Sequence, residues 1–145
     1  MYRKILLCYD GSVEGRNALK DGAEIAICMQ TETHLLAIMR SLVGHTIPEG
    51  VSENLILMEN QEAERVLSEG VAWLKERGLE SHGYIAFGDP IDQIDAIARR
   101  LEVDLIVVGH RRRSRLARWW SDAEDATLLD RAPCSILVAV APPAE

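Results

Sequence analysis

Short apolar runs alternate with longer amphipathic segments along the whole chain. The first run, Lys4–Tyr9 (KILLCY), is nearly continuous in apolar residues and ends in DGS, a turn signal. This pattern is typical of a strand that is buried on both faces. The same reasoning predicts four further strands, the third in sequence being weaker because His82 and Gly83 interrupt it: Thr33–Arg40, Ser81–Phe87, Asp104–Gly109 and Ser135–Val140.

Apolar residues at three- and four-residue spacing predict helices between these strands. One helix is expected over Val13–Gln30, after Ser12, a plausible N-cap residue. A second, long helical pattern ends at Gly78, where a glycine just past the last turn suits a helix end. In GDPIDQIDAIARRLEVD, Asp89 suits the N-cap and Pro90 the first helical position.

Strands that alternate with helices and are apolar on both faces indicate a parallel sheet covered on both sides. We expect one α/β doubly wound domain over residues 1–145, with a five-stranded parallel sheet and helices on both faces. A loop over Ser41–Ser52 and a last helix over about Asp122–Asp130 complete the pattern. Ligands bind such sheets beyond the carboxyl ends of the strands, where the strand order reverses. The ends concerned are YDGS after the first strand and GHRRRS after the fourth.

Composition and charge narrow the functional classes. The chain is 48% hydrophobic and 27% charged, as in soluble globular domains, and its formal net charge is −7. This acidic balance argues against nucleic-acid binding, since a phosphate backbone repels a net anion unless a basic face is segregated. The N-terminal apolar run is too short for a signal peptide or a membrane span, so we expect a cytoplasmic protein without membrane insertion.

The three cysteines, Cys8, Cys28 and Cys134, lie far apart and show no CxxC or histidine spacing. We expect them to be small buried apolar residues in a reducing compartment. The sequence therefore predicts neither a disulfide framework nor a metal site.

The segment GHRRRSRLARWWSDA, residues 109–123, places five arginines within eight residues. Arginine suits bidentate recognition of phosphate or carboxylate, so the run is a candidate anion site for a nucleotide, another phosphorylated ligand or an acidic partner protein. The alternative is a solvated loop whose arginines pair with nearby acids, such as Asp122, Glu124 and Asp125, on the same or a partner subunit. Both interpretations stay open.

Trp119 and Trp120 follow the arginines. They suit stacking on a base or anchoring a partner, but core or dimer packing is the favoured interpretation. Ser114 is a candidate for phosphorylation or ligand contact, or an ordinary surface residue. Of the histidines only His110, at the end of a predicted strand, is well placed, and no nucleophile and base stand near it at motif spacing. We therefore expect no enzymatic activity.

Four motifs, in order along the chain, resemble the universal stress protein family. They are YDGS after the first strand, GDP leading into an amphipathic helix, DLIVVGHRRRS after the fourth strand, and RAPCSILVAV at the end. The resemblance covers essentially the whole chain. It implies a role in stress survival and, in one branch of the family, ATP binding. It also implies a homodimer built partly through the last strand, with Ser135, Ile136, Leu137, Val138, Ala139 and Val140 as candidate interface residues.

The ATP-binding branch has a phosphate-loop pattern of glycine, two residues, glycine, nine residues, glycine, then serine or threonine. Counted back from residues 132–134, this chain aligns with the pattern without a gap. Gly109 matches the first glycine, whereas Arg112 and Asp122 replace the other two and Ala123 replaces the hydroxyl residue. A side chain at position 112 obstructs the approach of backbone N–H groups to phosphate. A carboxylate at position 122 can bind the free N–H groups at the start of the last helix, which would otherwise hold the phosphate. We therefore predict a degenerate phosphate loop.

These observations support hypotheses from different classes. The first is a non-enzymatic, homodimeric stress-response protein that acts through a regulatory protein partner. The second is an ATP or AMP sensor in which Asp10 and the Arg111–Arg118 segment replace the lost glycines, with ATP as a candidate ligand. Its candidate binding residues are Asp10, Gly109, His110, Arg112, Ser114, Arg115, Asp122 and Ala123. A third, an anion-responsive partner of a transporter or regulator, differs from the second only in its ligand.

Asp10 has two interpretations. It matches the family's acidic residue at the end of the first strand, near the nucleotide in ATP-binding members. It is equally a turn aspartate in DGS that caps the next helix.

Overall fold

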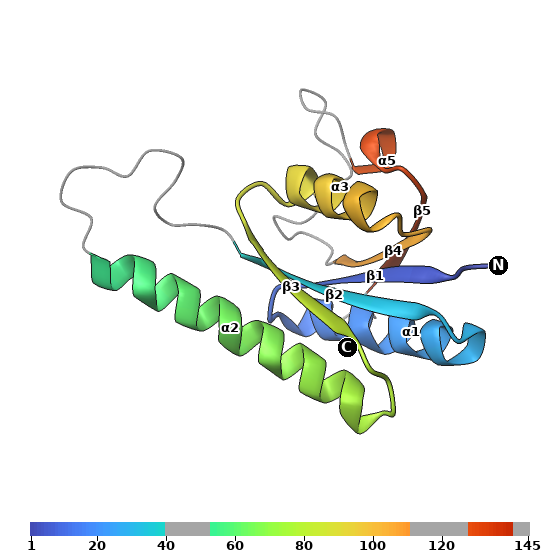
Figure 1. Cartoon of the computed structure of the whole chain (residues 1–145), viewed down its shortest axis with the longest axis horizontal. Helices are drawn as coiled ribbons and strands as arrows, with labels where there is room; N and C mark the ends of the chain where they lie inside the picture. Colours follow the sequence, from blue (N-terminus) through green and yellow to red (C-terminus); the bar gives the residue numbers. More distant parts are fainter. Residues whose placement is uncertain (40–52, 111–127, 141–145) are drawn as a thin grey trace.

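The computed structural model describes residues 1–39, 53–110 and 128–140 (Figure 1). They form a five-stranded, all-parallel sheet with the strand order β3-β2-β1-β4-β5. The predicted α/β fold is therefore confirmed, and the strand bounds differ from the predicted ones by at most one residue. The strands are β1 Lys4–Tyr9, β2 Glu32–Met39, β3 His82–Phe87, β4 Leu105–His110 and β5 Ser135–Val140.

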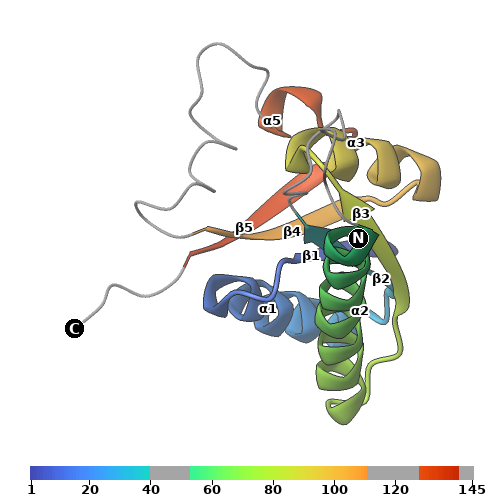
Figure 2. The ribbon, with the colours of Figure 1, turned by 90° about the vertical axis from the view of Figure 1, so that its left-hand side faces the viewer.

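Helices cover both faces of the sheet (Figure 2). Helices α1 (Val13–Met29) and α2 (Glu53–Glu76) lie on one face, and α3 (Pro90–Leu101) and the short α5 (Leu128–Arg131) lie on the other. Of the helix predicted over Asp122–Asp130, only residues from 128 onward are described. The predicted loop over Ser41–Ser52 lies outside the described residues.

The helix ends follow the predicted capping chemistry. Ser12 is the N-cap of α1, and its side chain accepts a hydrogen bond from the Gly15 N–H at 3.0 Å. Asp89 is the N-cap of α3 and accepts from the Ile91 N–H at 2.8 Å. After α2, Gly78 has φ +80°, a conformation that glycine adopts without strain. Local sequence therefore fixes where these helices begin and end.

The central strands are buried on both faces, which explains their continuous apolar runs. In β1, Leu7 and Tyr9 pack against α1 and α2, while Leu6 and Cys8 pack on the α3 side. The outer strands β3 and β5 are only partly buried. The strand order reverses between β1 and β4, because the chain winds from β1 toward β3 and then returns to the other side of β1. The carboxyl ends of β1 and β4 therefore flank the expected ligand position.

The cysteine prediction is wrong at one position. Cys8 is buried and Cys134 is half-buried, but Cys28 is exposed near the end of α1. Cys28 falls outside the helix stripe that faces the sheet, which consists of Gly15, Ala18, Leu19, Gly22, Ala23 and Ala26. Periodicity places Cys28 correctly, whereas residue type alone suggested burial.

This difference predicts the order in which the thiols react. We expect a water-soluble thiol reagent to modify Cys28 readily in the native protein and to leave Cys8 unmodified until the chain unfolds. Burial raises the pKa of the Cys8 thiol, so its reactive thiolate form is suppressed as well as shielded. Mass spectrometry of peptides after timed labelling measures both sites, and equal labelling rates at Cys8 and Cys28 would contradict the described packing.

Candidate functional site

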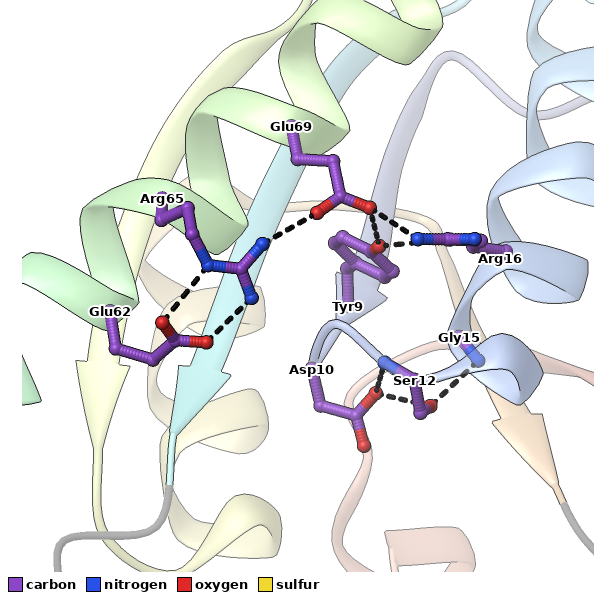
Figure 3. Close-up of polar contacts among 8 residues, drawn as sticks. All are labelled: Tyr9, Asp10, Ser12, Gly15, Arg16, Glu62, Arg65 and Glu69. Carbon is purple, nitrogen blue, oxygen red and sulfur yellow. Dashed lines mark hydrogen bonds and ion pairs between the residues drawn. The ribbon is translucent and has the colours of Figure 1, made fainter.

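The turn after β1 is held together by its own side chains (Figure 3). Asp10 Oδ1 accepts a hydrogen bond from the Ser12 N–H at 2.9 Å and another from the Ser12 hydroxyl. Gly11 has φ +86°, which lets the chain turn sharply between the strand and the helix. Asp10 is thus the turn aspartate of the second interpretation, although Ser12 rather than Asp10 caps α1. Its second carboxylate oxygen points away from the turn in Figure 3.

Gly109, near the end of β4, approaches the backbone of the first turn of α1. A Cβ atom at this position would lie 2.4 Å from the carbonyl oxygen of Glu14 and 2.9 Å from its carbonyl carbon. Real Cβ atoms essentially never come that close to backbone, so a glycine is required here by packing alone. The prediction that Gly109 begins a phosphate loop is not needed to explain its identity.

The structure brings some of the predicted site residues together. Asp10 and Gly109 lie at the carboxyl ends of neighbouring strands, beside the start of α1. His110 is the last residue of β4 and is paired in register with Val140 of β5. The other candidates lie outside the described residues, as do Trp119 and Trp120: Arg112, Ser114, Arg115, Asp122 and Ala123.

A polar network that sequence reasoning missed links β1, α1 and α2 beside this turn (Figure 3). Glu69 Oε1 accepts hydrogen bonds from the Tyr9 hydroxyl and from the Arg16 guanidinium, each at 2.8 Å. These two hydrogen bonds hold the pKa of Glu69 below its usual range. Burial raises the pKa of Tyr9, and the Glu69 carboxylate raises it further. Glu69 is therefore an ionised acceptor and Tyr9 a neutral donor.

The network continues along α2. Arg65 donates to Glu69 Oε2 at 3.0 Å and to both carboxylate oxygens of Glu62, at 2.6 and 2.9 Å. The spacing of Glu62, Arg65 and Glu69 by three and four residues is visible in the sequence and predicts pairing on one helix face. Nothing local reveals that Tyr9 and Arg16 join them. Through Glu69 the network joins α2 to Tyr9 of β1 and Arg16 of α1.

Within 1–39, 53–110 and 128–140, no group of three or more His, Cys, Asp or Glu side chains has an arrangement that could hold a metal ion. In the same ranges, no helix is both long and apolar enough to cross a bilayer.

The candidate interface strand β5 is an edge strand of the described sheet. Of its residues, Ala139 is buried, Ile136, Leu137 and Val138 are half-buried, and Ser135 and Val140 are exposed. Its outer side thus offers both unpaired backbone and partly exposed apolar side chains among the described residues.

Comparison with known proteins agrees with this architecture. A family profile described as "Universal stress protein family" matches residues 1–139, and the chain therefore belongs to this family. Universal stress protein YxiE of Bacillus subtilis is 25% identical over 146 residues, covering 95% of this chain and 99% of YxiE. The resemblance inferred from the four motifs is confirmed.

Solved structures share the fold. The universal stress protein UspA from Lactobacillus plantarum superposes with a TM-score of 0.73 at 24% identity, over 95% of this chain and 97% of that one. A universal stress protein from Archaeoglobus fulgidus, solved in complex with dAMP, gives a TM-score of 0.65 at 18% identity, over 94% and 97% of the two chains.

The Glu69 network predicts a specific loss of stability. We expect Glu69→Gln to lower the free energy of unfolding by about 1 kcal/mol at pH 7, because charge-assisted hydrogen bonds to a partly exposed group are lost. The pKa of Glu69 is lowered in the folded protein, so its contribution is present above the usual glutamate range and is lost as pH falls through the folded pKa. The difference between variant and wild type should therefore shrink in acid.

Urea unfolding of wild type and variant between pH 7 and pH 3 measures this difference. Glu62→Gln is the matched control, since the hydrogen bonds given for Glu62 among the described residues come from the exposed Arg65 of the same helix, and Glu62 is itself 49% exposed. A Glu69→Gln effect no larger than that of Glu62→Gln would show that the network does not hold α2 in place.

Proposed function

We propose that this universal stress protein is a cytoplasmic, non-enzymatic homodimer that acts through a protein partner and has lost the family's ATP loop. The observation that carries the proposal is that residues 109–123 align with the family's phosphate-loop pattern without a gap, but lack most of its residues. Arg112 and Asp122 stand in place of two glycines, and Ala123 stands in place of the hydroxyl residue. The contact of Gly109 with Glu14 explains why the first glycine persists, since packing requires it whether or not phosphate binds.

The expected electrostatic energies at Asp122 support the proposed loss of phosphate binding. A carboxylate about 4 Å from a phosphate charge costs on the order of 1 kcal/mol in water and roughly 4 kcal/mol at an effective dielectric of 20. A hydrogen bond from arginine to a charged group returns roughly 1.5 to 3 kcal/mol. One or two arginines therefore offset Asp122, but they do not rebuild a cradle of backbone N–H groups.

The non-enzymatic part of the proposal is supported by the hydrogen bonds that the carboxylates of Asp10 and Glu69 already accept. Asp10 Oδ1 is engaged by Ser12, and Glu69 is engaged by Tyr9 and Arg16. A general base must reach a proton on a bound reactant, and these carboxylate oxygens already accept hydrogen bonds from the protein itself.

The homodimer is supported by β5. An edge strand with partly exposed apolar side chains favours coverage by another chain, and in a symmetric dimer the same edge serves on both protomers.

A second candidate function is nucleotide sensing. The second carboxylate oxygen of Asp10 points away from the turn. Asp10 lies at the carboxyl end of β1, and ligands of such folds bind beyond the carboxyl ends of the strands. The relative from Archaeoglobus fulgidus was solved with dAMP, so this fold accommodates an adenine nucleotide in that protein. In this chain the sensor would use Asp10 with arginines of the Arg111–Arg118 segment, in place of the missing glycines.

Calorimetric titration separates the two functions. For the purified protein with magnesium and ATP at two salt concentrations, we expect no heat of binding and no shift in melting temperature at millimolar ATP. Micromolar binding that weakens with salt and is abolished by Arg115→Glu would overturn the proposal in favour of the sensor. Arg77→Glu is the control for charge reversal, because Arg77 lies at the far end of α2.

The dimer is tested by charging the edge strand. We expect wild type to sediment as a dimer at micromolar concentration and Val140→Lys to sediment as a monomer, because Val140 is 51% exposed on β5. Ile27→Lys is the matched control, since Ile27 is 50% exposed on α1 and should leave the dimer intact. A wild-type mass of one chain would refute the dimer.

A further inference from the structure

Two histidines face each other at the amino end of the sheet, at the edge opposite β5. His34 of β2 and His82 of β3 are direct register partners, and their ring centroids are 5.1 Å apart. His34 is only 5% exposed, whereas His82 is exposed. Histidine is the side chain that ordinarily changes charge between pH 5 and pH 8, so the pair can bring like charges together within the sheet.

The contacts of His34 determine where its proton lies. Nε2 lies 3.3 Å from a carboxylate oxygen of Glu32, without the alignment of a full hydrogen bond. Nδ1 lies 3.0 Å from the Tyr84 hydroxyl. Because a carboxylate can only accept, the neutral ring carries its proton on Nε2, and Tyr84 donates to Nδ1. A second proton must therefore enter at Nδ1, where the Tyr84 hydroxyl has to turn from donor to acceptor.

Charged groups of both signs lie around the two histidines. Lys4 of β1 lies 3.8 Å from Glu32, and Arg100 of α3 lies 5.9 Å from the centre of the Tyr84 ring. The Asp104 carboxylate, just before β4, accepts hydrogen bonds from the backbone N–H groups of Arg3 and Lys4. The nearby His34 ring N–H lowers the pKa of Glu32, which keeps this carboxylate ionised.

With both histidines neutral, the Glu32 carboxylate lies beside the Lys4 ammonium group. With both protonated, this one carboxylate faces two further cations, and like charges directly opposite each other destabilise a strand pair. One protonated histidine is balanced by Glu32, so the repulsion develops when the second proton binds.

The strand that loosens is β3. It pairs with β2 on one side and forms the edge of the described sheet on the other, with His82, Gly83 and Ile85 exposed. We propose that the His34–His82 pair is an acid-sensitive latch, which holds β3 on β2 near neutral pH and releases this edge strand when both imidazoles are protonated. The released edge would expose backbone and apolar surface in acid, and it needs neither a nucleotide nor the β5 interface.

Hydrogen exchange of the β3 amides tests the latch. We expect protection factors of residues 83–87, corrected for intrinsic exchange, to fall about 10-fold more than those of β1 between pH 7.5 and pH 5.5. His82→Gln removes the second charge from an exposed position and should abolish most of this fall. Glu32→Gln removes the counter-charge and should enlarge it. His45→Gln, which removes a histidine elsewhere in the chain, should behave as wild type.

The opposite directions expected for His82→Gln and Glu32→Gln separate the latch from general acid destabilisation. Equal acid sensitivity of β3 in wild type and His82→Gln would overturn the proposal. So would an unchanged β3 in wild type at pH 5.5, or a Glu32→Gln variant that is less acid-sensitive than wild type.

Discussion

The architecture depends on how closely β4 approaches the beginning of α1. At Gly109 the two backbones come so near that a single Cβ atom would lie 2.4 Å from the Glu14 carbonyl oxygen. This contact brings the start of α1 close to the carboxyl end of β4, where the strand order reverses. The Asp10–Ser12 turn and the cap of α1 lie beside it, because β1 and β4 are paired neighbours. Packing alone therefore requires a glycine at position 109, whether or not a ligand binds.

That distinction bears on the proposed loss of phosphate binding. Packing and capping require Gly109 and Ser12 whether or not a ligand binds. A glycine whose use is to hold phosphate is free to change once that binding is lost, as we propose for positions 112 and 122. Membership of the universal stress protein family thus establishes the fold, while the site residues decide the function.

Sequence patterns predicted the fold well because its determinants are local. Continuous apolar runs identified the strands, and Ser12, Asp89 and Gly78 marked the helix ends that the structure shows. Contacts between distant residues were not predictable in this way. Tyr9 and Glu69 are 60 positions apart, and their hydrogen bond depends on how α2 packs on β1. The facing of His34 and His82 depends on strand register, which the hydrophobic pattern of a two-sided buried sheet specifies weakly.

In the proposed function, three side chains, rather than the fold, abolish ATP binding. The most direct test restores the family pattern with Arg112→Gly, Asp122→Gly and Ala123→Ser in one protein and compares ATP affinity with wild type by calorimetry. We expect the restored protein to bind ATP with magnesium at least about 10-fold more tightly than wild type, the effect of removing one unfavourable contact of roughly 1.4 kcal/mol or more. Wild-type binding as tight as that of the restored protein would contradict the proposal.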